Sequence, residues 1–201
     1  PQLPQVSRKT VANLEKRGIE RFTDIQFQAF EPVYEGRDMI ARSRTGTGKT
    51  IAFGLPVIEK LAADAAAAEQ PLARRRPPRM IVMAPTRELA RQVENELAQI
   101  ARPHRLNTAV FHGGAPYGPQ EGALRNGLDI LVATPGRIID HLERGGLDLS
   151  QVMHVVLDEA DEMLDMGFQE DIEALLDACA TGCQKALFSA TLPGRLRAIA
   201  N

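Results

Sequence analysis

The segment SRTGTGKT at positions 43–50 carries residue types that bind a nucleoside triphosphate. Gly46 and Gly48 allow the backbone to turn so that successive N–H groups point inward, toward phosphate oxygens. Lys49 then reaches the β- and γ-phosphates, and the hydroxyl of Thr50 binds Mg²⁺. An apolar run precedes the segment and good helix formers follow it, which is the context that a phosphate-binding loop requires.

An apolar stretch that ends in Asp158 and Glu159 supplies the carboxylates that such a loop needs. Asp158 suits Mg²⁺, directly or through water, and Glu159 suits the orientation and deprotonation of an attacking water. Taken alone, the loop also reads as a glycine-rich turn with an exposed lysine, because Ser43 replaces the first glycine of the general pattern. The acidic pair alone also reads as the start of a helix. Together in one chain, they indicate a nucleoside-triphosphate hydrolase.

Short apolar, β-branched runs alternate along the chain with helical patterns. This alternation predicts βαβ units, and therefore an α/β fold with a mostly parallel central sheet and helices on both faces. Ligands of such sheets bind beyond the carboxyl ends of the strands, where the phosphate loop and the acidic pair both fall. The predicted strands are 38–41, 80–84, 107–111, 129–133, 154–158 and 185–189, and the predicted helices include 87–101, 137–145 and 168–180.

Composition limits the class of protein and of partner. The net charge of −2 excludes a broadly basic surface, so a nucleic acid would be held by local basic positions or by backbone N–H groups. No apolar run approaches the ~20 residues that cross a bilayer, and the start of the sequence lacks the apolar core of a signal peptide. These features predict a cytoplasmic protein. Cys179 and Cys183 are expected to be reduced thiols, because a zinc site needs about four ligands.

One segment, 62–79, breaks the alternation with an alanine run, prolines and an arginine cluster. The helix that follows the phosphate loop is expected to continue into the alanines and to end near Pro71. A flexible loop is therefore predicted at about 65–79. The arginines at 74–76 could touch RNA phosphates, but a solvated, variable loop is the favoured interpretation.

The residues Asp158-Glu159-Ala160-Asp161 spell the motif after which the DEAD-box RNA helicases are named. The chain resembles the first RecA-like domain of that family over essentially all of residues 1–201. The phosphate loop of the family commonly begins with Ala or Ser, so Ser43 fits, and the most similar subgroup is the bacterial heat-resistant RNA-dependent ATPase type. Further matches, in the family's order, are GIERFTDIQ (18–26), PTRELA (85–90), GG (113–114), TPGR (134–137), EMLDMGF (162–168) and SAT (189–191).

This resemblance implies an ATP-dependent RNA helicase, in which ATP hydrolysis is coupled to local duplex unwinding or to remodelling of RNA–protein complexes. Gln26 would pair with adenine, since its amide offers the one donor and one acceptor that adenine N6 and N7 require. ATP, with ADP and AMP as further candidates, would bind Gln26, Ser43, Thr45, Gly46, Thr47, Gly48, Lys49 and Thr50. Thr50 and Asp158 would hold Mg²⁺, and the catalytic residues would be Lys49, Asp158 and Glu159.

Two departures from the family pattern affect adenine recognition. Phe22 and Asp24 replace prolines that are common in the family, so a different start of the following helix is expected. The aromatic residue that stacks on adenine in the family would fall at about position 1, where this sequence has Pro1.

The segments PTRELA and TPGR each follow a predicted strand and start a helix, so they offer free N–H groups to a phosphate. Thr86 and Thr134 add hydroxyl donors, although both threonines also suit helix capping. The resemblance implies RNA contacts that follow the backbone and ignore base sequence. The implied RNA-binding residues are Pro85, Thr86, Arg87, Gly113, Gly114, Thr134, Pro135, Gly136 and Arg137, and the residues implied to couple nucleotide state to domain closure are Asp161, Ser189 and Thr191.

The resemblance also implies a second RecA-like domain downstream, which would complete the RNA path and supply arginine fingers worth ~10³–10⁵ in rate. The chain alone is expected to bind nucleotide and to hydrolyse it very slowly. Three alternatives stand beside this reading. A guanine-nucleotide switch lacks its [NT]-K-x-D motif here, and the acidic and SAT motifs disfavour a DNA-directed motor. A non-catalytic RNA-binding module stays open, and the replacement of Glu159 by Gln separates it from an ATPase.

Overall fold

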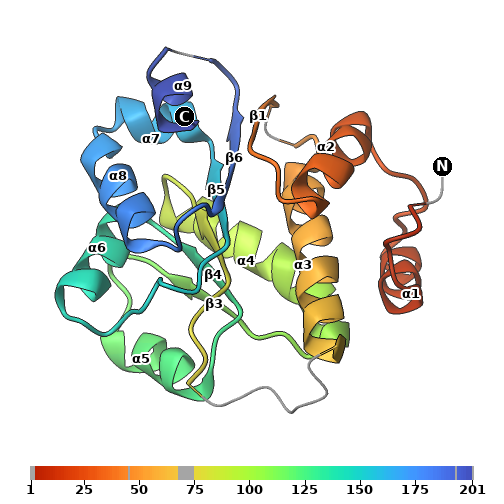
Figure 1. The fold of residues 1–201 in the computed structure, drawn as a ribbon, viewed down its shortest axis with the longest axis horizontal. Helices are drawn as coiled ribbons and strands as arrows, with labels where there is room; N and C mark the ends of the chain where they lie inside the picture. The colour runs from red at the N-terminus through yellow and green to blue at the C-terminus, as the bar shows by residue number, and fades with distance from the viewer. Residues whose placement is uncertain (1–2, 45, 68–74, 193, 201) are drawn as a thin grey trace.

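The computed structural model describes residues 3–44, 46–67, 75–192 and 194–200 of the chain. Its centre is a sheet in which every strand pairs in parallel with its neighbours, in the order β1-β6-β5-β2-β4-β3 (Figure 1). This arrangement confirms the predicted α/β fold. The strands are β1 (Met39–Arg42), β2 (Met80–Met83), β3 (Thr108–Phe111), β4 (Ile130–Ala133), β5 (His154–Asp158) and β6 (Gln184–Ser189).

Helices cover both faces of the sheet, and Figure 1 shows α1–α3 on one side and α6–α8 on the other. No helix in the described part of the chain is long and apolar enough to cross a membrane. The helices are α1 (Arg8–Lys16), α2 (Asp24–Tyr34), α3 (Lys49–Ala67), α4 (Arg87–Ala101), the 3₁₀ turn η1 (Arg102–His104), α5 (Tyr117–Asn126), α6 (Pro135–Glu143), α7 (Ala160–Asp165), α8 (Gln169–Ala178) and α9 (Gly194–Ala200).

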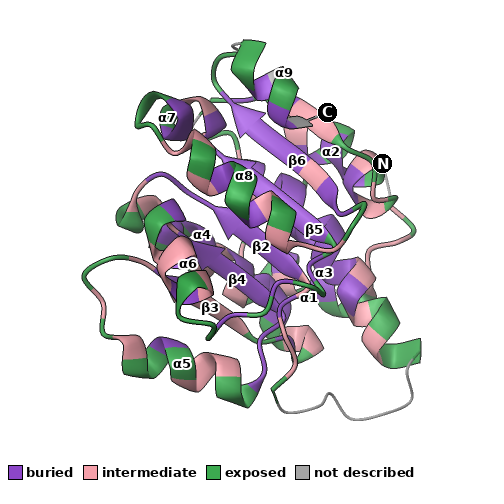
Figure 2. Cartoon of the chain, turned by 60° about the vertical axis from the view of Figure 1, so that its left-hand side comes forward, coloured by how far each residue is buried: buried purple, intermediate pink, exposed green. Residues whose placement is uncertain are grey.

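Two hydrophobic cores lie on opposite faces of the sheet, because successive side chains of a strand point to opposite faces. In β2, Met80 and Val82 join the core beneath α2, α3 and α4, whereas Ile81 and Met83 join the core beneath α6, α7 and α8. All four residues of β2 are buried, and Figure 2 shows the central strands β2, β4 and β5 as a buried layer beside helices whose outer faces are exposed. Burial on both faces explains why the strands read as continuous apolar runs.

The predicted elements lie close to the observed ones. Strand 154–158 and helix 87–101 match β5 and α4 residue for residue, and the other predicted strands differ at their ends by one residue. Helix α6 begins at Pro135, two residues before the predicted start, because proline suits the first turn of a helix. Helix α3 extends to Ala67 and so includes the first positions of the loop that was predicted at about 65–79; residues 68–74, with Pro71, lie outside the described residues.

The prediction that Arg76 lies in a solvated loop is wrong. Its Nε and Nη2 donate to the two carboxylate oxygens of Asp129, at 2.7 and 2.5 Å. Asp129 is fully buried, at the amino end of β4, and also accepts the backbone N–H of Asn107 at 2.7 Å. The hydrogen bond from Arg76 to Asp129 raises the pKa of the guanidinium. Arg76 therefore neutralises a buried charge within the protein and does not face RNA.

Candidate functional site

The phosphate loop connects β1 to α3 at the carboxyl edge of the sheet. Gly46 and Gly48 have φ values of 84° and 81°, a left-handed conformation that favours glycine. The hydroxyl groups of Ser43 and Thr47 lie 2.6 Å apart, and Thr47 donates to the carbonyl oxygen of Arg44 at 2.9 Å. Ser43 is buried, so its hydrogen bond to Thr47 stabilises the loop on the side that faces the protein interior. Of the predicted nucleotide-binding residues, Thr45 lies outside the described ranges.

The predicted catalytic residues meet beside this loop. The ammonium nitrogen Nζ of Lys49 lies 2.8 Å from Oδ1 of Asp158 and 3.3 Å from Oε1 of Glu159. They meet because β6 pairs with both β1 and β5, which brings the end of β5 next to the loop. Thr50 lies half-buried in the first turn of α3. Lys49 thus forms one compact charged cluster with two adjacent carboxylates, of which Glu159 is 110 positions away in sequence.

Asp158 has the character of a metal ligand. It is fully buried, and burial raises the pKa of its carboxyl, an effect that the nearby Lys49 ammonium opposes. Within the described ranges, its two oxygens lack a well-oriented hydrogen-bond donor, although Lys49 contributes the ion pair. Buried carboxylate oxygens beside a phosphate loop are the ligands that Mg²⁺ uses in such sites. Asp158 therefore fits the predicted magnesium position.

Glu159 has an unusual backbone conformation, with φ of 54° and ψ of 49°. A left-handed conformation at a residue other than glycine costs on the order of 1–3 kcal/mol and is concentrated at functional sites. At this position the chain leaves β5 and starts α7. The sharp turn directs the Glu159 carboxylate toward Lys49, within the charged cluster at the loop.

Gln26 braces the phosphate loop from α2. Its Oε1 accepts the N–H of Thr23 at 2.9 Å, and its Nε2 donates to the carbonyl oxygen of Gly48 at 3.1 Å. The hydroxyl of Thr23 donates to the carbonyl oxygen of Thr47 at 3.1 Å. Each amide atom of Gln26 can make a second hydrogen bond, so a donor and an acceptor remain for a base. The sequence pattern Thr-x-x-Gln is a capping box and signals this arrangement at the start of α2.

The predicted RNA-binding residues gather at the other half of the same sheet edge, beyond β2, β4 and β3. A hollow of about 410 Å³ lies between the three loops that follow these strands. Gly114 has a φ of 80°, and a Cβ there would lie 3.3 Å from Nη1 of Arg87. The lining residues are Pro85, Arg87, Gly113, Thr134, Gly136, Arg137, Asp140 and Phe168.

The two predicted threonine donors differ in what they do. The hydroxyl of Thr86 accepts the N–H of Leu89 at 3.3 Å and so caps α4. The hydroxyl of Thr134 makes no such cap at α6 and lines the hollow. Pro135 is buried in the first turn of α6. Only one of the two threonines is therefore used for helix capping.

The SAT segment is bonded directly to the acidic motif. The N–H and the hydroxyl of Thr191 donate to Oδ2 of Asp161 at 2.9 and 2.8 Å, and the N–H of Asp161 donates to Oγ of Ser189 at 3.3 Å. Burial works against ionisation of Asp161, but the hydrogen bonds from Thr191 and Ser189 outweigh it and lower the pKa. The end of β6 and the start of α7 are thereby joined.

Comparison with known proteins identifies the family that has this site. A family model described as DEAD/DEAH box helicase matches residues 23–199.

The chain belongs to the DEAD/DEAH box helicase family.

It is 48% identical over 194 residues to DEAD-box ATP-dependent RNA helicase 9, mitochondrial, of Arabidopsis thaliana, and 47% identical over 193 residues to ATP-dependent RNA helicase DDX50 of Mus musculus. These alignments cover 96% and 94% of the chain but only 31% and 26% of the relatives. The chain therefore spans about a third or less of the length of these curated relatives.

Solved structures agree with this DEAD-box assignment. A DEAD box protein from Methanococcus jannaschii is similar, with a TM-score of 0.86, 38% identity, and coverage of 99% of this chain and 52% of that one. A hypothetical ATP-dependent RNA helicase from Sulfolobus tokodaii has a TM-score of 0.84 at 35% identity, over 96% of this chain and 53% of that one. The RecA-like fold of this DEAD-box domain is thus shared with structures that are about twice as long.

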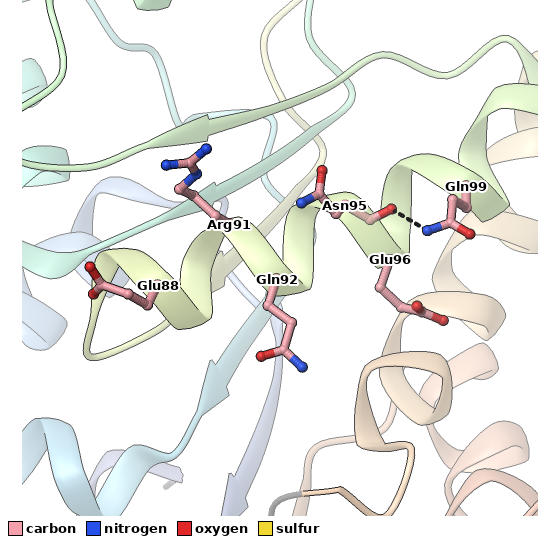
Figure 3. A pocket seen from close by; sticks show the side chains of 6 residues that line it. All are labelled: Glu88, Arg91, Gln92, Asn95, Glu96 and Gln99. Carbon is pink, nitrogen blue, oxygen red and sulfur yellow. Dashed lines mark hydrogen bonds between the residues drawn. The ribbon is translucent and has the colours of Figure 1, made fainter.

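A second, larger hollow on the DEAD-box domain has no comparable chemistry. Figure 3 shows six polar and charged side chains that project from α4. They line a hollow of about 490 Å³. All six come from one exposed helix face, and Gln99 donates to the carbonyl oxygen of Asn95 at 3.2 Å within that helix. The lining residues are Glu88, Arg91, Gln92, Asn95, Glu96 and Gln99.

Gly48 gives a direct test of the brace between α2 and the loop. A Cβ at position 48 would lie 2.3 Å from Nε2 of Gln26. The backbone at this position also has a positive φ, which is strained for any residue with a side chain. Gly48→Ala is expected to lower the free energy of unfolding by about 2–3 kcal/mol, from backbone strain and a lost hydrogen bond. Gly46→Ala, where a Cβ meets nothing within 4 Å, is expected to lower it by only about 1–2 kcal/mol.

Urea unfolding of the two variants measures the difference. In a Gln26→Ala background, the extra effect of Gly48→Ala should disappear, because the clashing amide is gone. Equal destabilisation by the two glycine variants would contradict the brace.

Proposed function

We propose that this chain is the nucleotide-binding RecA-like domain of an ATP-dependent RNA helicase that unwinds short duplexes or remodels RNA–protein complexes. The cluster of Lys49, Asp158 and Glu159 at the phosphate loop is the observation that carries this proposal. The names of the relatives, which are ATP-dependent RNA helicases, support the same activity. Because those relatives are much longer, we propose that a second RecA-like domain completes the active enzyme.

In this proposal, the chain's own residues bind and orient the nucleotide. Lys49 exchanges its carboxylate partners for the β- and γ-phosphates, while the N–H groups of the loop surround them. Thr50 and Asp158 hold Mg²⁺, which neutralises phosphate charge when it is bound. Glu159 orients the attacking water and accepts its proton, and Gln26 pairs with adenine through its remaining donor and acceptor.

RNA is proposed to bind at the hollow beyond β2, β4 and β3, along its sugar–phosphate backbone and without sequence preference. The sheet order supports this proposal, because the residues proposed for nucleotide chemistry follow β1, β5 and β6 and those proposed for RNA follow the adjoining strands of the same edge. The hydrogen bonds of Asp161 with Ser189 and Thr191 join the acidic motif to the end of β6, and we propose that they couple nucleotide state to domain closure. We further propose that the parent enzyme is of the bacterial heat-resistant RNA-dependent ATPase type, on the strength of its motifs.

Calorimetric titration of the chain with ADP and GDP tests the nucleotide site. Adenine is expected to be preferred about ten- to a hundredfold, the discrimination of one bidentate amide–base pair of ~1–3 kcal/mol. Gln26→Ala should reduce that ratio toward one, whereas Gln28→Ala, an exposed glutamine of the same helix, should leave it unchanged. Equal affinities in the unaltered chain would refute adenine recognition.

The requirement for a second domain has its own test. The chain alone is expected to show negligible RNA-stimulated hydrolysis of ATP, because no arginine finger is supplied to the γ-phosphate. Joined to a second RecA-like domain, it is expected to gain RNA-stimulated hydrolysis. Rapid RNA-stimulated turnover by the chain alone would count against this proposal.

A further inference from the structure

The two arginines predicted to contact RNA differ in the solvent exposure of their side chains and in the number of their protein partners. The side chain of Arg87 is 61% exposed, and its Nε donates only to the neighbouring Glu88, at 3.0 Å. The side chain of Arg137 is 9% exposed. An exposed guanidinium can move to meet a phosphate, whereas a buried one is committed to the partners that surround it.

The partners of Arg137 belong to three different segments. Its Nη1 donates to the carbonyl oxygen of Ala115 at 2.9 Å and to Oε1 of Gln120 at 3.2 Å. Its Cζ lies 4.3 Å from the ring centroid of Tyr117, and its Nε lies 3.8 Å from Oδ2 of Asp140. One side chain on α6 is thus bonded to the turn that follows the GG pair and to two residues of α5.

A second layer of side chains fixes these partners. Gln120 is buried, and its Oε1 lies 2.7 Å from Nε2 of His141 as well as next to Arg137. Arginine can only donate, so the amide atom that faces it is the oxygen, and Nε2 of His141 must carry its proton toward the same oxygen. The hydroxyl of Tyr117 donates to Asp140, which fixes the ring beneath the guanidinium.

We propose that Arg137 serves RNA binding as a positioning residue, and that Gln120 and Tyr117 are further positioning residues that act through it. Arg137 fixes the distance between the turn that contains and follows Gly113-Gly114 and the N-terminus of α6. The backbone N–H groups of these two places are the ones proposed to bind phosphates. The inference rests on the proposed RNA-binding function. The guanidinium of Arg137 is bonded to protein acceptors. Direct contact with phosphates in this hollow is therefore assigned to backbone N–H groups and to the exposed Arg87.

Salt dependence separates a positioning residue from a phosphate contact. A cation that neutralises one phosphate of single-stranded RNA contributes about 0.7 to the slope of log affinity against log salt, whereas a positioning residue contributes nothing. The probe is a fluorescein-labelled oligouridine, titrated with this chain by fluorescence anisotropy at several KCl concentrations. Gln120→Met keeps the side-chain length but removes the acceptor, and is expected to weaken binding about tenfold, the size of one lost hydrogen bond to a charged group, with the slope unchanged.

Arg137→Lys is the second variant. It keeps the charge but loses the planar fork and the stacking on Tyr117, so it is expected to weaken binding to a similar extent, again without a change of slope. Tyr117→Phe removes only the hydroxyl and gives a third measurement if Gln120→Met does not fold. Gln92→Met, an exposed glutamine of the α4 hollow in Figure 3, is the matched control and should bind RNA as the unaltered chain does.

Three results would overturn the inference: full affinity in Gln120→Met, full affinity in Arg137→Lys, or full affinity in Tyr117→Phe when Gln120→Met does not fold. A slope that falls by about 0.7 in an Arg137→Gln variant would also overturn it, because that loss marks a direct phosphate contact. ADP affinity should stay unchanged in all these variants, since their contacts lie away from the phosphate loop. If neither the unaltered chain nor a protein that joins it to a second RecA-like domain bound RNA at any salt concentration, the proposed function itself would fail.

Discussion

Replacing Glu159 by glutamine is expected to lower RNA-stimulated ATP hydrolysis by a factor of about 10²–10⁴, which is the usual contribution of a general base. The amide has the same shape as the carboxylate but cannot accept a proton from water. ATP should still bind, because Lys49 and the loop N–H groups remain. The measurement is steady-state hydrolysis by a protein that joins this chain to a second RecA-like domain, with ATP affinity determined by calorimetry.

Glu170→Gln is the matched control for that measurement, because Glu170 is an exposed carboxylate of α8 outside the charged cluster. Its hydrolysis rate should equal that of the unaltered enzyme. If Glu159→Gln also hydrolysed ATP at the normal rate, the reading of the chain as a non-catalytic RNA-binding module would gain ground over the ATPase.

Removal of the buried carboxylate of Asp129 is expected to lower the free energy of unfolding by about 3–5 kcal/mol in an Asp129→Ala variant, as when one partner of a buried ion pair is lost. The change leaves the Arg76 guanidinium without its two short hydrogen bonds and the N–H of Asn107 without its acceptor. Urea unfolding measures the loss.

The exposed pair of Arg37 and Glu35, 2.7 Å apart, provides the comparison for Asp129. Glu35→Ala should change the free energy of unfolding by less than about 1 kcal/mol, because water already solvates both charges. Combined replacement of the buried pair by Arg76→Met and Asp129→Leu should recover only part of the stability. No Arg76 charge is then left uncompensated, but the N–H of Asn107 and the guanidinium of Arg79, 3.9 Å from Asp129, still lose their partner. A small effect of Asp129→Ala alone would show that the buried pair contributes little.

The sequence predicted the sheet, and the proximity of Lys49 to Asp158, for one physical reason. Parallel strands buried on both faces must be apolar runs, and their carboxyl ends must share an edge, so Lys49 and Asp158 were expected to meet. Local patterns could not reveal partners that only the folded chain brings together. Arg76 contacts Asp129, 53 residues away, and Gln120 of α5 contacts Arg137 of the next helix, α6, 17 residues away.

Helix ends were predicted less accurately than the helices themselves. Helix α3 continues into the alanines as predicted, because alanine has the highest helix propensity, but it passes position 65, where the loop was expected to begin. At α6, proline at the first turn moved the start to Pro135. The hydroxyl pair of Ser43 and Thr47 was likewise invisible, because it depends on the curvature of the loop.

The ammonium of Lys49, 2.8 Å from Asp158 and 3.3 Å from Glu159, acts as an internal counterion. When this lysine turns to a triphosphate, it uncovers two carboxylates beside an anion, and like charges at such distances repel strongly in a buried site. A second cation must therefore arrive as the first one departs. We therefore expect the site to bind a nucleotide together with Mg²⁺ more tightly than a nucleotide without metal, for which Lys49 would have to leave its two carboxylate partners uncompensated.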